Sequence, residues 1–477
     1  MHAYLTPINS SNAPIPTGSS SGPDDGACPT RPTLTPTPTR ASAAVSSPAA
    51  AFTSTDRSLF SGAPDVDAAF DVVPDRRGTS SLKWDFAVER GRPADVLPLW
   101  VADMDHATAP AVTSALLWRT RHGIFGYSDP DDAYNAALTS WFSRRYGWRV
   151  EAGWNTVTPG VVPALALAVR ALSAPGEAVI IEEPVYYPFR EVVEDNGRSV
   201  AAVPLVRDAD GVYRRDLAAL EATIEETGSR LLLLCNPHNP VGRVWSRDEL
   251  TALDEVASRH GVVVVADEIH ADLALPGFAT TPFASLGEAT AARTITCTSP
   301  SKSFNLAGLQ VANILIADAR LREAFRRELA ATGYSQPNVL GLTACRAAYE
   351  GGEAWLDALR EHIAAARAHV EARLERIKGI EAAPCEGTYL LWLDCSGLID
   401  AAGLEADELD DFMLRQAGLW LDDGRIFGAG GEGFTRINVA CARTTLDAAL
   451  DRLEAAATAV IARAAKTARR GRIALSA

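Results

Sequence analysis

The sequence predicts an α/β protein whose sheet is mostly parallel and covered by helices on both faces. Two observations predict this class. From about Phe70 onward, short unbroken runs of apolar residues recur, as expected for strands that are buried on both faces. Between these runs, apolar residues return at the spacing of amphipathic helices. The chain has 477 residues, enough for two or three domains and a large buried core.

The central part of the chain carries most of the predicted strands. We expect strands at residues 177–182, 230–235, 262–266, 294–298 and 310–317, which are short and rich in apolar residues. Before the third strand, Ser246 and Glu249 have the spacing of a capping box, which predicts a helix that ends near His260. A large α/β domain over residues 120–350 contains all of these elements.

A smaller α+β domain is predicted from the two flanks of this region. Residues 353–378 have apolar residues at helical spacing and predict one long amphipathic helix. Two more strands are expected at residues 389–393 and 434–440. We assign residues 351–465 to this domain, together with part of an N-terminal arm over residues 66–119.

The two ends of the chain are predicted to lie outside both domains. Residues 1–65 consist mainly of Ser, Thr, Pro and Ala, so they cannot bury enough surface to offset the entropy of ordering and are predicted to be disordered. They lack the apolar segment of a secretory signal, and Asp24 and Asp25 argue against a transit peptide. We interpret them as a non-functional extension, and residues 466–477 as a tail.

Composition and charge exclude several classes of protein. With 45 Lys and Arg against 60 Asp and Glu, the net charge is −15, and most of the surface would repel a nucleic acid backbone. No run reaches ~18 apolar residues, so we expect a soluble, cytoplasmic protein without a membrane span. The 7 cysteines form no C-x-x-C pair and the 8 histidines form no ligand cluster, so neither disulfides nor a metal site is expected.

Residues suited to chemistry follow several of the predicted strands, where ligands of open α/β sheets bind. Gly160 begins a helix whose free N–H groups suit a phosphate, although many helices simply begin after a glycine. Asp267 ends a run of valines, where a buried carboxylate needs a partner such as a protonated ring nitrogen. Lys302 stands between serines and before an apolar segment, where loss of water lowers a lysine pKa and makes the amine a nucleophile or base.

Ten short motifs occur in a specific order between about residues 70 and 455. They are residues 83–85, 97–105, 125–127, 160–163, 184–189, 236–240, 267–270, 301–309, 386–394 and 436–438. In this order and at these separations, the chain resembles the fold-type I pyridoxal-5′-phosphate (PLP) enzymes of the class I/II aminotransferase superfamily. Within that superfamily it looks most like the MalY/PatB-type cystathionine β-lyase branch, a group of carbon–sulfur (C–S) lyases.

The resemblance implies the aspartate aminotransferase-like fold, with a mostly parallel seven-stranded sheet in the large domain and a smaller α+β domain. It also implies PLP as the cofactor. Lys302 would bind PLP covalently and then remove the Cα proton of the substrate. Asp267 would pair with the protonated pyridine nitrogen. Asn239 would hydrogen-bond the oxygen on the ring, His270 would lie nearby, and Tyr186 would stack on the ring face.

The phosphate contacts and a shared site are implied in the same way. The phosphate would bind the backbone of Val161 and Val162 and the hydroxyls of Ser299 and Ser301. Tyr127 resembles the tyrosine that reaches the phosphate of the neighbouring subunit. This places Tyr127 among the catalytic residues and implies a homodimer with shared active sites.

The resemblance also supplies the substrate contacts. Arg436 would bind the α-carboxylate of the substrate as a bidentate fork, with Asn438 beside it. Trp100, Asp103 and Asp105 fall in the loop that lines the substrate side in this branch. A core position for Trp100 and helix caps for the two acids are the alternatives.

Two positions depart from the pattern of the family. Aminotransferases commonly have an arginine on the phosphate a few residues after the lysine, where this chain has Gln310. The lyase loop usually continues with Phe after Ala-Asp-Met-Asp, where this chain has His106, and this side chain is expected to lie where it could meet the substrate.

The predicted function is a PLP-dependent C–S β-lyase that cleaves cystathionine or a related cysteine S-conjugate to a thiol, pyruvate and ammonia. The implied setting is methionine biosynthesis, and the expected partners are a small amino-acid substrate and a second copy of the chain. The alternatives are a class I/II aminotransferase on the same scaffold and a PLP-binding regulatory protein.

Overall fold

The computed structural model describes residues 70–475 and the side chains of residues 70–469. The extension predicted to be disordered, residues 1–65, lies outside the described residues. The boundaries predicted for the two domains stay a prediction.

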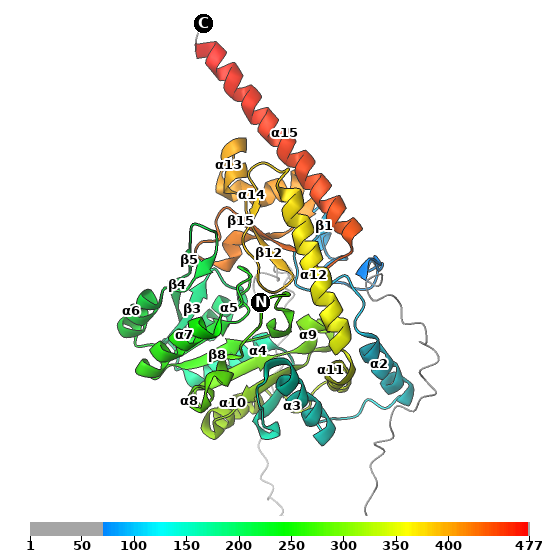
Figure 1. The fold of residues 1–477 in the computed structure, drawn as a ribbon, viewed down its shortest axis with the longest axis vertical. Coiled ribbons are helices and arrows are strands. Elements are labelled where there is room, and N and C mark those ends of the chain that lie inside the picture. The colour runs from blue at the N-terminus through cyan, green and yellow to red at the C-terminus, as the bar shows by residue number, and fades with distance from the viewer. Residues whose placement is uncertain (1–69, 476–477) are drawn as a thin grey trace, which may run out of the picture. The chain divides into compact units, whose positions relative to one another are not determined.

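A seven-stranded sheet forms the centre of the described chain (Figure 1). The strand order is β2-β10-β9-β8-β7-β3-β4, and only β10 runs antiparallel to its neighbours. This confirms the predicted mostly parallel sheet. The strands are β2 (Asn155–Thr158), β3 (Ala178–Glu183), β4 (Ser199–Pro204), β7 (Leu231–Cys235), β8 (Val263–Asp267), β9 (Thr294–Thr298) and β10 (Ala312–Ile316).

Strand β7 shows why the predicted strands are apolar without interruption. Alternate side chains of a strand point to opposite faces of a sheet. Leu231 and Leu233 pack into one hydrophobic cluster with the helices α4 (Val161–Leu172), α5 (Pro188–Glu194) and α10 (Ala319–Ala331). Leu232 and Leu234 pack into a second cluster, with α6 (Leu217–Thr227) and α7 (Arg247–His260). Both faces are therefore covered by helices, and the predicted capping box of Ser246 and Glu249 begins α7.

A second sheet lies in the part of the chain assigned to the smaller domain. Its order is β11-β12-β15-β14, and all its strands are antiparallel to their neighbours. The helices α12 and α15 lie side by side next to it (Figure 1). The elements are β11 (Glu381–Ala382), β12 (Leu390–Asp394), β14 (Asp422–Asp423), β15 (Phe434–Asn438), α12 (Glu353–Leu374) and α15 (Arg443–Leu475).

The N-terminal part of the described chain joins this second region through β1 (Leu97–Pro98), which pairs in parallel with β13 (Leu419–Trp420). The pairing brings the loop after β1 next to β15, because the backbone N–H of Asn438 donates to the carbonyl oxygen of Leu99 at 2.9 Å. The remaining helices and strands are α2 (Pro110–His122), α3 (Asp132–Tyr146), α8 (Glu288–Ala291), α9 (Pro300–Ser303), α11 (Val339–Gly351), α13 (Ser396–Ala402), α14 (Leu409–Asp411), β5 (Val206–Arg207) and β6 (Tyr213–Arg214).

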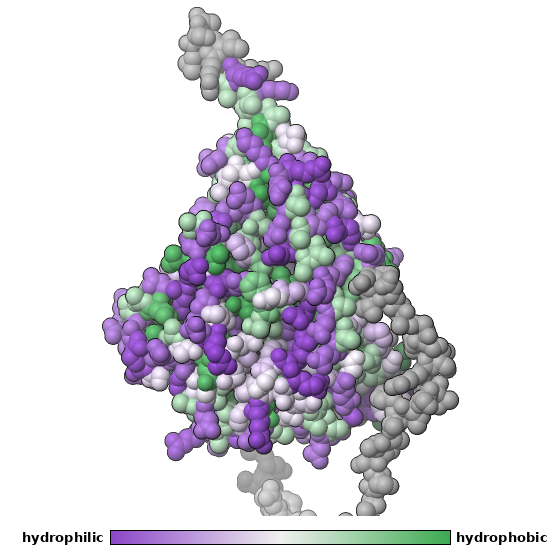
Figure 2. All heavy atoms as spheres, viewed as in Figure 1, coloured by the Kyte–Doolittle hydropathy of each residue, from purple (hydrophilic) through white to green (hydrophobic). Residues whose placement is uncertain are grey.

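The exposed surface is mostly hydrophilic in the view of Figure 2, with apolar residues in small groups. Among residues 70–475, no helix combines the length and the apolar character that a membrane span requires. The six cysteines that the structure describes are buried and form no disulfide.

Candidate active site

The residues predicted to form the site come together at one edge of the central sheet. Strands β9, β8, β7 and β3 are parallel, and β2 has the same direction because β10 is antiparallel to both β2 and β9. Their carboxyl ends therefore lie at the same edge, where such sheets bind ligands. The segments that follow these ends contain Gly160, Tyr186, Asn239, Asp267 and Lys302.

Lys302 lies in the short helix α9, whose first turn is capped by the side chain of Ser299. Its Nζ donates a hydrogen bond of 2.6 Å to the carbonyl oxygen of Ala102. Burial lowers the pKa of Lys302 to about 8, although the carboxylates of Asp103 and Asp267 act in the opposite direction. The neutral fraction near neutral pH is therefore much larger than that of an ordinary lysine, which suits an amine that must act as a nucleophile and base.

Asp267 is 4% exposed at the end of β8, and its Oδ1 accepts a hydrogen bond of 3.1 Å from the backbone N–H of Ile269. Burial raises the pKa of Asp267 to about 7, against the effects of that N–H and of the charge on Lys302. A cationic group placed beside this carboxylate would offset the cost of its burial. The structure therefore agrees with the need for a cationic partner that the sequence indicated.

His270 lies in a buried position near Lys302 and Arg436, whose charges act on it. Its ring is 6.1 Å from the ring of Tyr389, edge to face, and its Nδ1 has no hydrogen-bond partner among the described residues. Burial and the positive charges of Lys302 and Arg436 keep the pKa of His270 well below its usual value, so the imidazole is neutral. A neutral imidazole with an unused nitrogen can take a ligand as donor or acceptor.

Arg436, on β15, reaches Asn239 from the second sheet. Its NH1 donates to Asn239 Oδ1 at 2.7 Å, and its NH2 donates to the carbonyl oxygen of Trp100 at 3.2 Å. A second acceptor for NH2 is the carboxylate of Asp422. The backbone N–H of Tyr186 donates to the carbonyl oxygen of Asn239 at 2.9 Å. This hydrogen bond links the two residues that are predicted to contact the cofactor ring.

The loop after β1 is held against this cluster by its backbone rather than by its side chains. Asn438 Nδ2 donates to the carbonyl oxygens of Val101 and Asp103 at 2.8 and 2.6 Å. The carbonyl oxygen of Ala102 accepts from the hydroxyl of Tyr389 at 3.0 Å as well as from Lys302. Asn438 thus positions the loop, while its predicted contact with substrate stays a prediction.

The side chains of Trp100, Asp103 and Asp105 make their direct contacts outside the cluster, although the charge of Asp103 still acts on Lys302. Trp100 is 3% exposed and stacks on Trp420 at 4.4 Å, which corresponds to the core alternative. The interpretation of the two acids as helix caps is wrong, because they form ion pairs. Arg76 bridges both carboxylates at 2.7 Å, and Lys83 Nζ lies 2.8 Å from Asp105.

His106 is not placed where it could meet a substrate side chain, and that expectation is wrong. It is 3% exposed, and its ring packs edge to face against Phe70 at 5.3 Å and His362 at 5.0 Å. Burial lowers the pKa of His106 to about 3, so it stays neutral in this packing.

The predicted phosphate contacts surround two helix starts. Val161 and Val162 form the first turn of α4, whose early N–H groups lack intrahelical partners. The Ser299 hydroxyl donates to the carbonyl oxygen of Val311 at 2.6 Å and accepts from the backbone N–H of Ser301 at 3.0 Å. Ser299 therefore already caps α9, and its contact with a phosphate, like that of Ser301, stays a prediction.

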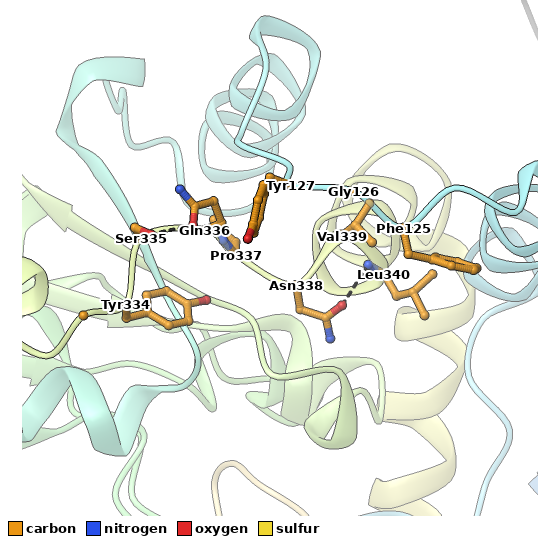
Figure 3. A pocket seen from close by; sticks show the side chains of 11 residues that line it. Phe125, Gly126, Tyr127, Tyr334, Ser335, Gln336, Pro337, Asn338, Val339 and Leu340 are labelled. Carbon is orange, nitrogen blue, oxygen red and sulfur yellow. Dashed lines mark hydrogen bonds between the residues drawn. The ribbon is translucent and has the colours of Figure 1, made fainter.

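Tyr127 lies apart from this cluster, on the connection between α2 and α3, and is 93% exposed. It lines an open pocket of about 460 Å³ together with Phe125 and residues 333–340 (Figure 3). None of the residues around Lys302 lines this pocket. Within one chain, Tyr127 does not join the predicted site.

Three neighbouring residues were missed by the sequence analysis. Tyr389 lies in one of the ten motifs of the family, at residues 386–394, but no role was predicted for it. Asp422 follows an apolar segment as Asp267 does, so the cost of a buried carboxylate was a signal that could have identified it. Asn305 fixes the loop after β1, because its side chain accepts from Met104 N at 3.0 Å and donates to the carbonyl oxygens of Met104 and His106.

Asp272 stabilises the segment that contains Lys302. Its carboxylate accepts hydrogen bonds from Ser303 Oγ at 2.8 Å, from Trp141 Nε1 at 3.1 Å and from the hydroxyl of Tyr146. The Asp272→Ala change leaves three donors without this acceptor, so we expect it to lower the free energy of unfolding by about 2–4 kcal/mol.

Urea denaturation measures this effect. The Asp400→Ala change, at an exposed aspartate of α13, serves as the matched control and should leave the free energy of unfolding nearly unchanged. Equal stabilities of the two variants would contradict a supporting role for Asp272.

Comparison with known proteins extends this picture. The family model described as aminotransferase class I and II matches residues 94–453. The chain belongs to this aminotransferase family. Among curated members of the family, cystathionine β-lyase PatB of Bacillus subtilis (strain 168) is 43% identical over 81% of this chain and 99% of PatB. Protein MalY of Escherichia coli (strain K12) is 35% identical over 79% of this chain and 96% of MalY.

A solved structure of the aminotransferase family agrees with the fold. Cystalysin from Treponema denticola, which contains PLP, is 35% identical to this chain and superposes with a TM-score of 0.78, covering 82% of this chain and 99% of cystalysin. These findings confirm the predicted family, its MalY/PatB-type branch and the aspartate aminotransferase-like fold.

Proposed function

We propose that this chain is a PLP-dependent C–S β-lyase that cleaves L-cystathionine or a related cysteine S-conjugate to a thiol, pyruvate and ammonia. The observation that carries the proposal is one cluster at the sheet edge. There the buried amine of Lys302 interacts with the carboxylate of Asp267 and the guanidinium of Arg436. The relatives named as cystathionine β-lyases support the choice of reaction.

The residues of this cluster fit PLP. Lys302 offers an amine with a lowered pKa for a covalent bond to an aldehyde, and the buried carboxylate of Asp267 needs a cationic partner. His270 has a buried nitrogen without a partner among the described residues, and α4 begins at the same edge with free N–H groups for a phosphate. When bound, PLP withdraws electrons from the Cα of an amino acid and makes its proton acidic.

The side chains of this cluster would then have separate roles in the reaction. Arg436 holds the α-carboxylate and, together with Asn239, sets the direction of the bonds around Cα. Lys302 Nζ takes the Cα proton, because it is the amine of the cluster with the lowered pKa. Asp267 keeps a positive charge at the ring nitrogen. The Cβ–S bond of the substrate breaks after the proton has been removed, the thiolate leaves, and the remaining aminoacrylate reacts with water to give pyruvate and ammonia.

The proposal is tested with purified protein loaded with PLP and given L-cystathionine without any 2-oxo acid. Free thiol and pyruvate should form in equal amounts, and the Lys302→Ala variant should form neither. If no thiol appears, but 2-oxoglutarate and a panel of amino acids yield glutamate, the chain is an aminotransferase and the lyase proposal is wrong.

We infer that two copies of the chain form a homodimer with shared active sites. Support comes from apolar side chains that α2 and the following connection expose, among them Trp118 at 61% and Tyr127 at 93%. A second copy would cover them and could receive Tyr127 in its site. The resemblance further suggests a cytoplasmic enzyme of methionine biosynthesis.

Mixing two inactive variants tests the shared site. If Tyr127 serves the neighbouring subunit, dimers of a Lys302→Ala chain with a Tyr127→Ala chain contain one intact site. Refolding the two together should then restore up to about one quarter of the wild-type rate, since half of the dimers are mixed and half of their sites are intact. No gain over the separate variants would contradict shared sites.

A further inference from the structure

Arg436 already has a buried anionic partner. Asp422 lies opposite Arg436 in the β14–β15 pair, and its carboxylate accepts a hydrogen bond from the guanidinium NH2. Both residues are nearly buried, at 6% and 2% exposure, so water screens the pair very little. A substrate carboxylate bound to Arg436 would be the second anion on one cation.

The guanidinium still has donors for such an anion. Of its five N–H groups, three donate to Asn239 Oδ1, to the carbonyl oxygen of Trp100 and to Asp422. Arg436 Nε is buried and has no hydrogen-bond partner among the described residues. Nε and one N–H of NH1 therefore remain as donors for a second carboxylate, and the charge of Asp422 affects how tightly that carboxylate binds.

Among the described residues, Arg436 is the cation that contacts the Asp422 carboxylate directly. The charged groups with the largest effects on the pKa of Asp422 are Arg436, Asp410 of α14 and Arg92, and the titratable hydroxyl of Tyr186 also interacts with Asp422. Arg92 is itself paired with Asp410 at 3.0 Å. The next carboxylate of β14, Asp423, pairs with Arg425 instead.

We propose that Asp422 is a positioning residue that shares Arg436 with the α-carboxylate of the substrate and thereby limits how tightly that carboxylate binds. This inference rests on the proposed function, in which Arg436 binds the α-carboxylate. An ionised Asp422 neutralises Arg436 in the free enzyme and repels the incoming anion. A protonated Asp422 leaves the full charge of Arg436 to the substrate.

Carboxylate binding is therefore coupled to a proton. Burial raises the pKa of Asp422, while the charge and hydrogen bond of Arg436 lower it and the charge of Asp410 raises it again. A bound α-carboxylate adds a second negative charge and raises this pKa further, so substrate binding favours the protonated form of Asp422. Affinity for the carboxylate then falls as the pH rises through the pKa of Asp422.

Two small ligands isolate this effect in the PLP-loaded protein. L-Alanine has an α-carboxylate but no group that could leave from Cβ, and ethylamine is the same molecule without the carboxylate. Their dissociation constants are read from the change in the cofactor's visible absorbance over the whole pH range in which the protein is folded. The ratio of the two affinities cancels effects of the amino group and of Lys302 and reports the carboxylate alone.

The Asp422→Asn change keeps an acceptor oxygen for Arg436 and removes the charge. We expect the affinity ratio to rise roughly tenfold at about pH 8, as for an electrostatic change worth one pKa unit, and to lose its dependence on pH. The Asp423→Asn change, on the same strand, is the matched control and should leave the wild-type ratio and its pH dependence in place.

The outcomes separate this inference from the proposed function. An unchanged or lower ratio in Asp422→Asn overturns the role of Asp422. If the Arg436→Gln change leaves the ratio unaltered, Arg436 does not bind the carboxylate and the substrate contact in the proposed function is wrong. Should Asp422→Asn fail to fold, the wild type decides, because a ratio that stays constant over the whole pH range in which the protein is folded contradicts the coupled proton.

Discussion

The Lys302→Ala variant is expected to lose roughly 10⁴-fold or more of the wild-type kcat for L-cystathionine, with its fold intact. The change removes both the covalent anchor for PLP and the base for the Cα proton. It costs little stability, because Nζ makes a single hydrogen bond, to Ala102, and its lowered pKa shows that the charged amine is disfavoured there. Circular dichroism and urea denaturation check the fold.

Two further measurements identify the role of this lysine. Borohydride reduction followed by peptide mass analysis should find PLP on Lys302 in the wild type and on no peptide of the variant. Added methylamine should restore part of the rate, because a free amine can replace the missing base. Lys378→Ala, at an exposed lysine, is the control. More than about one tenth of the wild-type kcat in Lys302→Ala would contradict the assignment.

The central sheet could be predicted because short stretches of the sequence are enough to indicate its strands and the helices that cover it. Strands such as β7 are apolar at every position, since both faces are covered, and the capping box of α7 is contained in four residues. The edge strand β4 was not identified, because it pairs only with β3 and alternates buried with exposed residues such as Ala202 and Pro204. Its sequence therefore lacks the unbroken apolar run.

The candidate site was predicted where the type of a single residue and its neighbours in the sequence indicate which partner that residue requires. Asp267 and Lys302 were identified because a carboxylate and an amine stand in apolar surroundings. The partners of Arg436 could not be derived in this way, because they lie up to 336 residues away in the chain. His106 was misplaced for the same reason, since only the packing of the N-terminal segment on α12 buries it against His362.

The Asp267→Asn variant should lose roughly 10²–10³-fold in kcat, because an amide cannot keep a positive charge at the ring nitrogen of PLP. Saturating PLP should not rescue the rate, since the defect lies in the electrostatics of the bound state. Steady-state kinetics with L-cystathionine measure the loss. A kcat within a few-fold of wild type would exclude a charge interaction of Asp267 with the cofactor.

The same change should stabilise the cofactor-free protein at alkaline pH. Burial raises the pKa of Asp267 from 3.8 to about 7, so the folded state holds a proton that the unfolded chain releases between these values. Stability of the wild type therefore falls as the pH rises through this window, and it is the ionised, unpaired carboxylate that costs free energy. Asparagine has no such cost, and we expect it to add up to about 4 kcal/mol at about pH 8.

The pH dependence of this gain distinguishes it from a simple change in packing. Near pH 4 the folded wild type is protonated at Asp267 and the unfolded chain is only partly ionised, so the gain of Asp267→Asn should fall below about 1 kcal/mol there. Burial raises the pKa of Glu268 to about 8, and the charge of Asp267 raises it too, so removing that charge also favours ionised Glu268 at alkaline pH and adds to the gain there. Urea denaturation at the two pH values, with the exposed Asp400→Asn as control, decides. A gain of equal size at both pH values would show that the charge of Asp267 is not its source. PLP loading should make the wild type more stable than Asp267→Asn at about pH 8, because the bound cation stabilises only the carboxylate.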